Sequence, residues 1–217
     1  MTKTLTQLIA DTQALLLDDG TRFSTATVTA AVRSALKEFN QRAPIFSGTL
    51  VDAVSNQYEY VLSASDFANL IDIQDVLLQG TDSALDLNTP LPFDSYFEDA
   101  APVIRLRSPQ PTGRYLIVRF TTPYTVSGLD SETESTLPAF YDNTLIDGAC
   151  FWSAQIRSAG RIETINLNQG VSENWIDVRR YFRQAFDLGL AQAARRRPPV
   201  SEPDTAAWND RFYGTDQ

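Results

Sequence analysis

The densest group of potential ligands in the chain is an acidic run in which Asp130, Glu132 and Glu134 alternate with polar residues. Clustered carboxylate oxygens are the ligands that Ca²⁺ prefers. A calcium-binding EF-hand loop needs Gly at its sixth position and Glu at its twelfth, but Ser135 and Tyr141 stand there. The run therefore favours a solvated acidic loop, and we expect neither a metal nor a cofactor.

Few side chains could act as a nucleophile or as a general base near neutral pH. The sequence contains no histidine and one cysteine, Cys150, which excludes His-dependent triads, His-ligated metals and an internal disulfide. Cys150 falls within a predicted helix without a His or a second Cys to activate it, so a structural role is favoured. A hydrolase that uses two facing carboxylates stays open as an alternative, but we expect no catalytic residues and no enzymatic activity.

Residues near the C-terminus are the strongest candidates for partner binding. They are a cationic cluster, Arg195, Arg196 and Arg197, and three aromatic residues of the tail 198–217, Trp208, Phe212 and Tyr213. The arginines could complement a helix dipole, or bind an acidic partner surface or a phosphate backbone. Large aromatics are common interface anchors, and the polar, proline-rich start of the tail should not fold alone. The tail could fold back on its own helices, but we expect it to dock on a neighbouring chain.

Helices at both ends of the chain must position these residues. The clearest spans 24–43, with Ser24 as its N-cap, Phe23 and Val28 as a hydrophobic staple and Pro44 as its stop. Its apolar stripe recurs at three- and four-residue steps: Val28, Val32, Ala35, Leu36 and Phe39. A first helix is expected over 4–18, followed by Gly20 in the left-handed conformation. Its stripe is Leu5, Leu8, Ile9, Leu15 and Leu16.

Two further helices are expected after a connector over 123–138. The first spans 139–160, and its inward residues are Leu145, Ile146, Ala149, Trp152 and Ile156. The second begins with Ser172 as its cap and with Val171 and Ile176 as its staple. It ends at about Arg197, before two prolines.

The middle of the chain is rich in β-forming residues between turn signals. About five strands are expected in one antiparallel sheet, over 48–54, 57–62, 70–78, 103–107 and 114–120. The last two should form a hairpin through 109–113, and 93–100 is expected to hold a helical turn. An aromatic quartet could form a binding face, although such residues more often pack within a sheet: Tyr58, Tyr60, Tyr115 and Phe120.

The order of these elements predicts an α+β fold. An antiparallel helical bundle would form from the N- and C-terminal helix hairpins, with an inserted antiparallel β-subdomain and an extended C-terminal tail. The expected boundaries are 1–45 for the first hairpin, 46–123 for the β-subdomain, 124–197 for the connector and second hairpin, and 198–217 for the docking tail.

The charge of the chain limits its partners. The formal net charge of −9 disfavours ordinary nucleic-acid binding, because phosphate neutralisation requires a basic surface. An acidic protein can still line a path along which DNA slides without adhering. No run of about eighteen apolar residues is present, so no membrane span is expected, and the N-terminus does not resemble a signal peptide.

Three stretches of the chain resemble the head–tail adaptor (connector or neck) proteins of tailed bacteriophages. They are AAVRSALKEFNQRAPIFSG at 30–48, YEYVLSASDF at 58–67 with IDIQDV at 71–76, and the segment from Asp147–Trp152 to Tyr181–Phe186. The first is similar to the family's helix and loop that enter the β-insert. The second is similar to its strand, turn and strand, and the third to its closing helix hairpin.

This resemblance implies a virion structural protein of the neck, at the head–tail junction, assembled in the bacterial host cytoplasm. Subunits would form a homo-oligomeric ring, a dodecamer by family resemblance, between the portal protein and the tail or tail-completion proteins. Double-stranded DNA would pass through the ring without specific binding. Because the family's C-terminal segment commonly reaches onto the portal, docking would fall on Arg195, Arg196, Arg197, Trp208, Phe212 and Tyr213. Asp130, Glu132 and Glu134 would be candidates for the lumen.

Two other interpretations stay open. The chain could be a tail-tube or stopper subunit whose tail binds a tail protein. It could instead be a cytoplasmic helical module that binds a small ligand or a regulatory partner, which predicts a monomer or dimer with an apolar internal pocket. The adaptor interpretation predicts a closed rotational ring.

Overall fold

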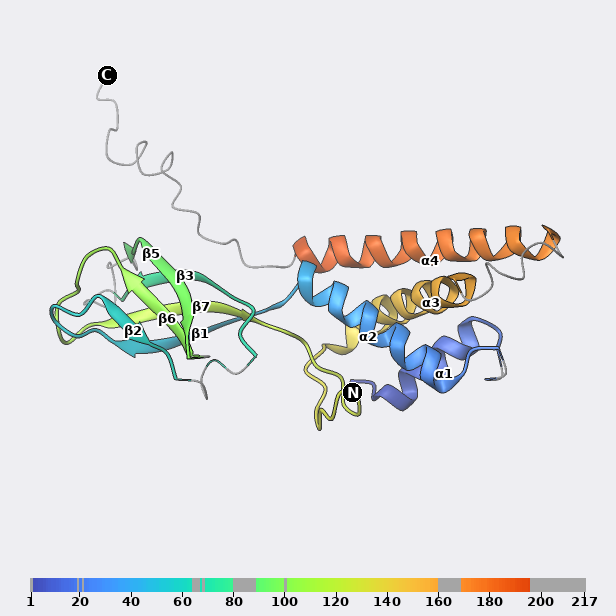
Figure 1. Cartoon of the computed structure of the whole chain (residues 1–217), viewed down its shortest axis with the longest axis horizontal. Coiled ribbons are helices and arrows are strands. Elements are labelled where there is room, and N and C mark those ends of the chain that lie inside the picture. Colours follow the sequence, from blue (N-terminus) through green and yellow to red (C-terminus); the bar gives the residue numbers. More distant parts are fainter. Residues whose placement is uncertain are drawn as a thin grey trace, which may run out of the picture. The chain divides into compact units, whose positions relative to one another are not determined.

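A computed structural model of the chain shows a mixed fold of helices and two antiparallel sheets (Figure 1), which confirms the predicted α+β class. It describes residues 2–18, 20, 22–63, 67, 69–79, 89–99, 101–159 and 169–195, and only the backbone of 159 and 169–175. The described residues belong to two compact units. A helical unit lies within 1–45 and 123–196, and a β unit lies within 46–122.

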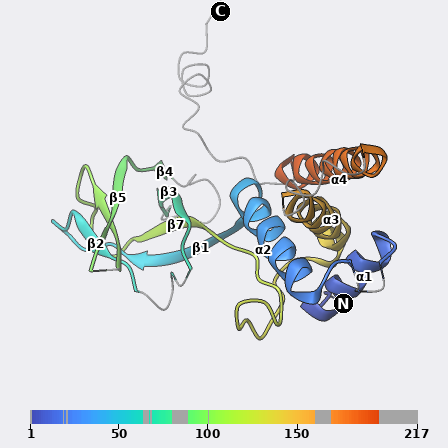
Figure 2. The ribbon, with the colours of Figure 1, turned by 45° about the vertical axis from the view of Figure 1, so that its right-hand side comes forward.

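The helical unit is arranged around α3. Its elements are α1 (Leu5–Leu15), α2 (Thr25–Arg42), the 3-10 turn η1 (Ala139–Tyr141), α3 (Asp142–Ala159) and α4 (Gln169–Arg195). Helix α3 packs against α1, α2 and α4, and it lies between α4 and the other two in both ribbon views (Figures 1 and 2). Helices from both ends of the sequence therefore share one core.

The starts of α1 and α2 follow from their caps. Thr4 and Gln7 form a reciprocal capping box at α1, and the Ser24 hydroxyl accepts from the Thr27 amide at 3.2 Å at α2. The predicted limits of α2 are confirmed, and Phe23 and Val28 are both fully buried. Helix α1 ends three residues earlier than predicted. Leu17 takes a positive φ of 51° after it, in addition to Gly20 at 90°.

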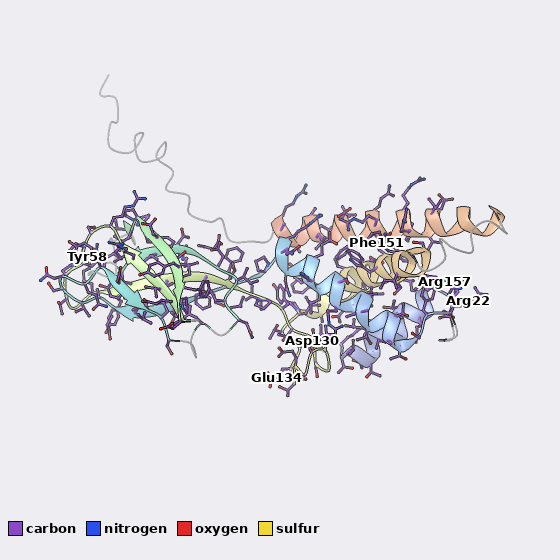
Figure 3. The ribbon with its side chains drawn as sticks, in the orientation of Figure 1. Arg22, Tyr58, Asp130, Glu134, Phe151 and Arg157 are labelled. Atoms are coloured by element: carbon purple, nitrogen blue, oxygen red, sulfur yellow. The ribbon has the colours of Figure 1, made fainter. Side chains whose placement is uncertain are left out.

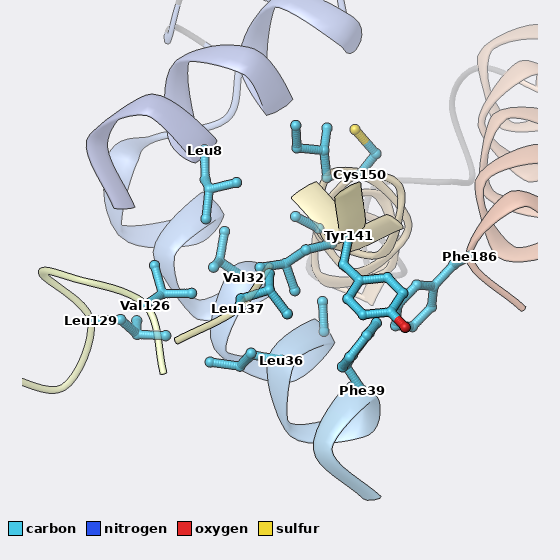
Figure 4. Close-up of a cluster of buried hydrophobic side chains, with 14 of the residues drawn as sticks. Leu8, Val32, Leu36, Phe39, Val126, Leu129, Leu137, Tyr141, Cys150 and Phe186 are labelled. Atoms are coloured by element: carbon cyan, nitrogen blue, oxygen red, sulfur yellow. The ribbon is translucent and has the colours of Figure 1, made fainter. Parts of the chain in front are cut away.

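The core of the helical unit contains side chains from all four helices and from the 123–138 connector (Figure 4). Its largest fully buried members are Leu8, Val28, Val32, Phe23, Phe39, Leu137, Leu145, Phe186 and Leu190. The rings of Phe39 and Tyr141 meet edge to face, with centroids 5.1 Å apart. Leu15 and Ile156 were expected to face inward, but both are exposed, and each lies in the last turn of its helix.

Two glycines allow the helices to approach closely. A Cβ atom placed on Gly148 of α3 would lie 2.8 Å from the Phe186 ring of α4 and 2.9 Å from Ala35 Cβ of α2. A Cβ atom placed on Gly189 of α4 would overlap with the Thr144 side chain of α3. Neither position has room for a larger residue without displacement of its neighbours.

The connection between α1 and α2 is tied to α3. The Arg157 guanidinium donates to the backbone oxygen of Arg22 at 2.7 Å and lies 5.0 Å from the centroid of the Phe23 ring (Figure 3). The Asp18 carboxylate accepts from the backbone amides of Arg22 and Phe23 at 3.0 and 2.6 Å. These contacts fix the turn from which α2 begins.

The start of α4 corrects the sequence prediction. Its backbone is helical from Gln169, so Ser172 lies inside the helix and is not its N-cap. The predicted staple partner Ile176 is largely exposed. Phe182, Phe186 and Leu190 of α4 are buried in the core, and the described part of the helix runs to Arg195.

The β unit consists of two separate sheets. One has the order β1-β7-β3-β4 and the other the order β2-β6-β5. The strands are β1 (Ile45–Asp52), β2 (Glu59–Val61), β3 (Asp72–Leu78), β4 (Thr89–Pro90), β5 (Phe93–Glu98), β6 (Ala101–Leu106) and β7 (Tyr115–Thr122). Both sheets contribute to one apolar core, which includes Tyr60, Ile104, Leu116, Val118 and Phe120.

Three predictions for the β unit were wrong. The expected single sheet is two sheets, and β6 and β7 lie in different ones, so 109–113 is a connection between sheets and not a hairpin loop. Residues 93–98 form strand β5, antiparallel to β6 with Phe93 opposite Leu106, instead of a helical turn. Every residue of β5 after Phe93 is exposed, so its sequence lacks the apolar alternation that indicates a strand.

Of the four aromatic residues that could form a binding face or pack within a sheet, two are buried and two are partly exposed. Tyr60 and Phe120 are buried in the β core, whereas Tyr58 and Tyr115 are partly exposed. In the part of the chain that the structure describes, no helix has the length and apolar character needed to cross a membrane.

Candidate functional site

The residues predicted to bind a partner lie at and beyond the end of α4. Arg195 is the last residue of α4 and is exposed. Arg196, Arg197, Trp208, Phe212 and Tyr213 lie outside the described residues, as does the whole tail 198–217. Their proposed role in docking stays a prediction.

The connector that carries the acidic run is anchored in the helical unit. Val126, Leu129 and Leu137 are buried in its core (Figure 4). The Ser127 carbonyl accepts from the Leu5 amide at 2.9 Å, and the Ser135 hydroxyl donates to the Lys3 carbonyl at 3.1 Å. The connector is therefore a folded loop held against the start of α1.

Hydrogen bonds also join the two ends of this loop. The Thr125 amide donates to the Thr136 hydroxyl at 2.8 Å, and the Thr136 amide donates to the Thr125 carbonyl at 3.1 Å. The Ser127 amide donates to the Ser135 hydroxyl at 2.8 Å. The acidic run lies at the tip of the loop, where Asp130 and Ser131 take positive φ values of 52° and 70°.

Asp130 is held by an arginine of α2. Arg33 donates through Nε and Nη2 to the Asp130 carboxylate, with distances of 2.8 and 2.6 Å to Oδ1 (labelled Asp130 in Figure 3). The hydrogen bond from Arg33, together with its positive charge, lowers the pKa of Asp130. Asp130 is therefore ionised at neutral pH, but its charge is balanced by Arg33.

Glu132 and Glu134 are the uncompensated acids of the loop. Both are exposed, and within the described residues neither carboxylate makes an ion pair. Their backbone oxygens are used to shape the loop, because Glu132 O accepts from the Gly128 amide and Glu134 O from the Thr125 hydroxyl. The described residues contain no group of three or more His, Cys, Asp or Glu side chains placed to hold a metal ion.

Cys150 is enclosed by the helical core. It is fully buried on α3, and its thiol approaches the Thr12 carbonyl of α1 at 3.8 Å. Burial, together with the nearby negative charge of Asp147, raises the pKa of the Cys150 thiol far above its ordinary value. A thiol that stays protonated and inaccessible is a packing group, not a nucleophile.

Asp147 is a partly buried carboxylate on α3 whose pKa is raised by burial. The folded chain therefore binds this proton more tightly than the unfolded chain does. Stability contributed by the proton is present below the ordinary pKa of Asp, about 4, and is lost as the pH rises through the raised pKa. At neutral pH, the charged Asp147 destabilises the fold.

We therefore expect Asp147→Asn to raise the melting temperature by about 2 °C near neutral pH. The gain should shrink as the pH falls and disappear below the ordinary pKa of Asp, because the native side chain is then protonated too. Thermal unfolding of both proteins, followed by circular dichroism across this pH range, measures the difference. A lower melting temperature for the variant at neutral pH would contradict the expectation.

A charged network that the sequence analysis missed connects α2 with α4. Arg183 donates through Nη1 and Nη2 to the Glu38 carboxylate at 3.0 and 2.8 Å, and through Nε to Asp187 at 2.8 Å. Arg42 bridges Asp187 and Glu38 at 3.1 and 3.2 Å. The hydrogen bond that Arg183 donates to Glu38 is the main cause that raises the pKa of Arg183.

The sequence contained a partial signal for this network. Glu38 with Arg42, and Arg183 with Asp187, are spaced four residues apart, which predicts a pair along each helix. The contact between the helices joins residues 145 positions apart and has no signal in sequence spacing. Arg183 also lies 5.1 Å from the centroid of the Phe151 ring of α3, so it connects α4 with both α2 and α3 (Figure 3 labels Phe151).

Comparison with known proteins does not assign the chain to a family. No protein-family model matches the chain, and no curated protein matches it. One solved structure that it is similar to is described as the neck of an empty GTA (gene transfer agent) particle, computed with C6 symmetry, with 17% identity and a TM-score of 0.28. The likeness covers 58% of this chain and 66% of that chain, so the chain spans less than two thirds of its length.

Proposed function

We propose that this protein is a virion structural protein without enzymatic activity, a head–tail adaptor that forms a ring below the portal of a tailed bacteriophage. The ring would continue the DNA channel and provide the docking surface for the tail. The order of the elements is the observation that supports this proposal best. Helices from both ends of the chain share one core, and the strands between them form a unit of their own, which is the layout of the family that the sequence resembles.

The likeness to the GTA neck has no weight in this proposal, because a TM-score of 0.28 is too low to support shared architecture. The support comes instead from the three stretches of sequence resemblance and from the charge. A net charge of −9 suits a conduit that DNA must pass without adhering, since like charges repel.

The acidic loop fits a lumenal position in this proposal. The loop is fixed by Val126, Leu129 and Leu137, so its charges would keep a defined place in every subunit of a ring. Because Arg33 neutralises Asp130, Glu132 and Glu134 would supply the repulsion. Asp130 would act mainly by holding the tip of the loop against α2.

The C-terminal residues would anchor the adaptor to the portal protein. Arg195, at the end of α4, is exposed and begins the cationic cluster that leads into the aromatic tail. A tail tethered to a docked ring has a high effective concentration at its receiving groove. Trp208, Phe212 and Tyr213 would then provide the apolar anchors.

Binding to heads that lack this protein tests the proposal. Heads purified from a mutant without it would be mixed with the full-length chain or with a chain that lacks 198–217, and the particles would be examined by electron microscopy. We expect the full-length chain to add a ring at one vertex, and the shortened chain to add none or far fewer.

Each outcome separates the possibilities. Equal decoration by both chains would refute the anchoring role of the tail and keep the adaptor role. Decoration of isolated tails in place of heads would favour the tail-tube or stopper subunit. If neither chain binds heads or tails, the adaptor role is refuted, and a cytoplasmic ligand- or partner-binding module becomes the better interpretation.

A further inference from the structure

The outward side of α4 carries a regular row of exposed residues. They are Asp177, Tyr181, Gln184, Leu188, Ala191 and Arg195. They follow one another at alternating steps of four and three, which is the spacing of the core positions of a coiled coil. Tyr181 is 66% exposed and Leu188 is 61% exposed, although the opposite side of α4 is buried in the core. We call these six residues the α4 row.

The sequence of the α4 row complements itself when a second copy runs in the opposite direction. With the two copies centred at the level of Phe186, Tyr181 faces Ala191 of the second copy. Gln184 faces Leu188, and Asp177 faces Arg195. Every contact is then repeated by the two-fold axis, as a symmetric interface between identical surfaces requires.

Size and charge both favour this antiparallel arrangement over a parallel one. The large ring of Tyr181 meets the small side chain of Ala191, and the acidic end of the row meets the basic end. A parallel pair would instead place Asp177 against Asp177 and Arg195 against Arg195, and like charges in contact disfavour association. Among the residues that the structure describes, Asp177 has only a loose pair with Arg180, at 3.5 Å and with both side chains mostly exposed.

We propose that the free protein forms an antiparallel homodimer in which the α4 row packs against the α4 row of a second copy. This contact goes beyond the proposed function. A two-fold contact cannot by itself close a ring around DNA, so it describes the chain before assembly. Asp187, which would approach its own copy near the axis, is already bound to Arg183 and Arg42 at 2.8 and 3.1 Å.

The oligomeric state of the full-length chain gives the first test. Light scattering coupled to gel filtration, over a wide range of protein concentrations, should show a dimer that dissociates on dilution. The double variant Tyr181→Ala/Leu188→Ala should be monomeric throughout that range. Ile176→Ala removes an exposed apolar side chain of the same helix outside the row, and this control should dimerise like the native chain. A native chain that stays monomeric at every concentration would overturn the proposal.

Charge reversal tests the pairing of the two ends. Asp177→Arg alone and Arg195→Asp alone each replace two attractive contacts per dimer by two repulsive ones, and each should weaken dimerisation about tenfold at low salt. The double variant exchanges the charges and should recover most of the native affinity. Two single variants with native affinity would refute this pairing.

Disulfide formation between different variants tests the direction. Tyr181→Cys and Ala191→Cys chains would be prepared separately and oxidised alone or mixed, with the buried Cys150 left in place. The antiparallel pair predicts a covalent dimer chiefly in the mixture. Strong covalent dimers of each variant alone, without a gain on mixing, would show a parallel pair and overturn the proposal.

Discussion

Replacing Gly148 by valine is expected to lower the free energy of unfolding by about 3 kcal/mol. Gly148 lies where α2, α3 and α4 meet, and its Cβ would approach the Phe186 ring to 2.8 Å and Ala35 Cβ to 2.9 Å. The Ala35 Cβ is fixed to its backbone, and both neighbours are fully buried. Relief therefore requires a shift of one helix relative to another, which disturbs the packing of the whole core.

Gly148→Ala should also lower the free energy of unfolding, by less than Gly148→Val does. Alanine favours helix over glycine by about 1 kcal/mol, so a loss of stability on Gly148→Ala would show that the clash exceeds this gain. Asn143→Val, at an exposed position five residues earlier on α3, is the matched control for a β-branched residue. Urea unfolding with a common m-value measures all three variants. Unfolding midpoints that coincide for Gly148→Val and Asn143→Val would refute the tight crossing.

The need for Gly148 illustrates why helix packing was harder to predict than the helices themselves. The helix stripe of Val28, Val32 and Phe39 could be recognised because its members are neighbours along the sequence. The space around Gly148 depends on Ala35 and Phe186, which are remote in sequence, and a glycine inside a helix looks locally like a defect. The need for glycine at such a position is set by tertiary contacts, which cannot be predicted from composition or periodicity.

The β unit shows a second limit. Buried alternation identified β3 and β7 approximately, because each has one face in the apolar core. Strand β5 is exposed and is specified by its hydrogen bonds to β6, so residues 93–98 carried no periodic signal. The division into two sheets depends on which strands pair. The preference of residues for strands does not indicate which strands are neighbours.

The candidate site was predictable only in part for the same reason. The acidic run and the C-terminal arginines stand out by composition, so Asp130, Glu132 and Glu134 could be selected from the sequence. The pairing of Arg33 with Asp130 could not be predicted from the sequence, because 97 positions separate the two residues. Once folded, the three acids are no longer equivalent, and the charge available to an approaching polyanion belongs to Glu132 and Glu134.

Replacing Arg183 by methionine should destabilise the helical unit by about 2 kcal/mol, through the loss of its paired hydrogen bonds to Glu38. The Glu38 side chain is only 15% exposed, so water can hydrate its carboxylate little. In the variant, the ion pair with Arg42 at 3.2 Å would be its remaining compensation. Methionine preserves much of the contact with the Phe151 ring, which limits the loss to the charged network.

Arg180→Met is the matched control for Arg183→Met, because Arg180 lies on the same helix and pairs with Asp177 at 3.5 Å on an exposed surface. Its cost should stay below about 0.5 kcal/mol, as for other exposed ion pairs. Glu38→Gln completes a double-mutant cycle with Arg183→Met, and the two changes together should cost less than their sum, since the second removes a charge that the first left unpaired. Strict additivity in urea unfolding would mean that Arg183 stabilises α4 through Asp187 and through its contacts with aromatic rings, and not through Glu38.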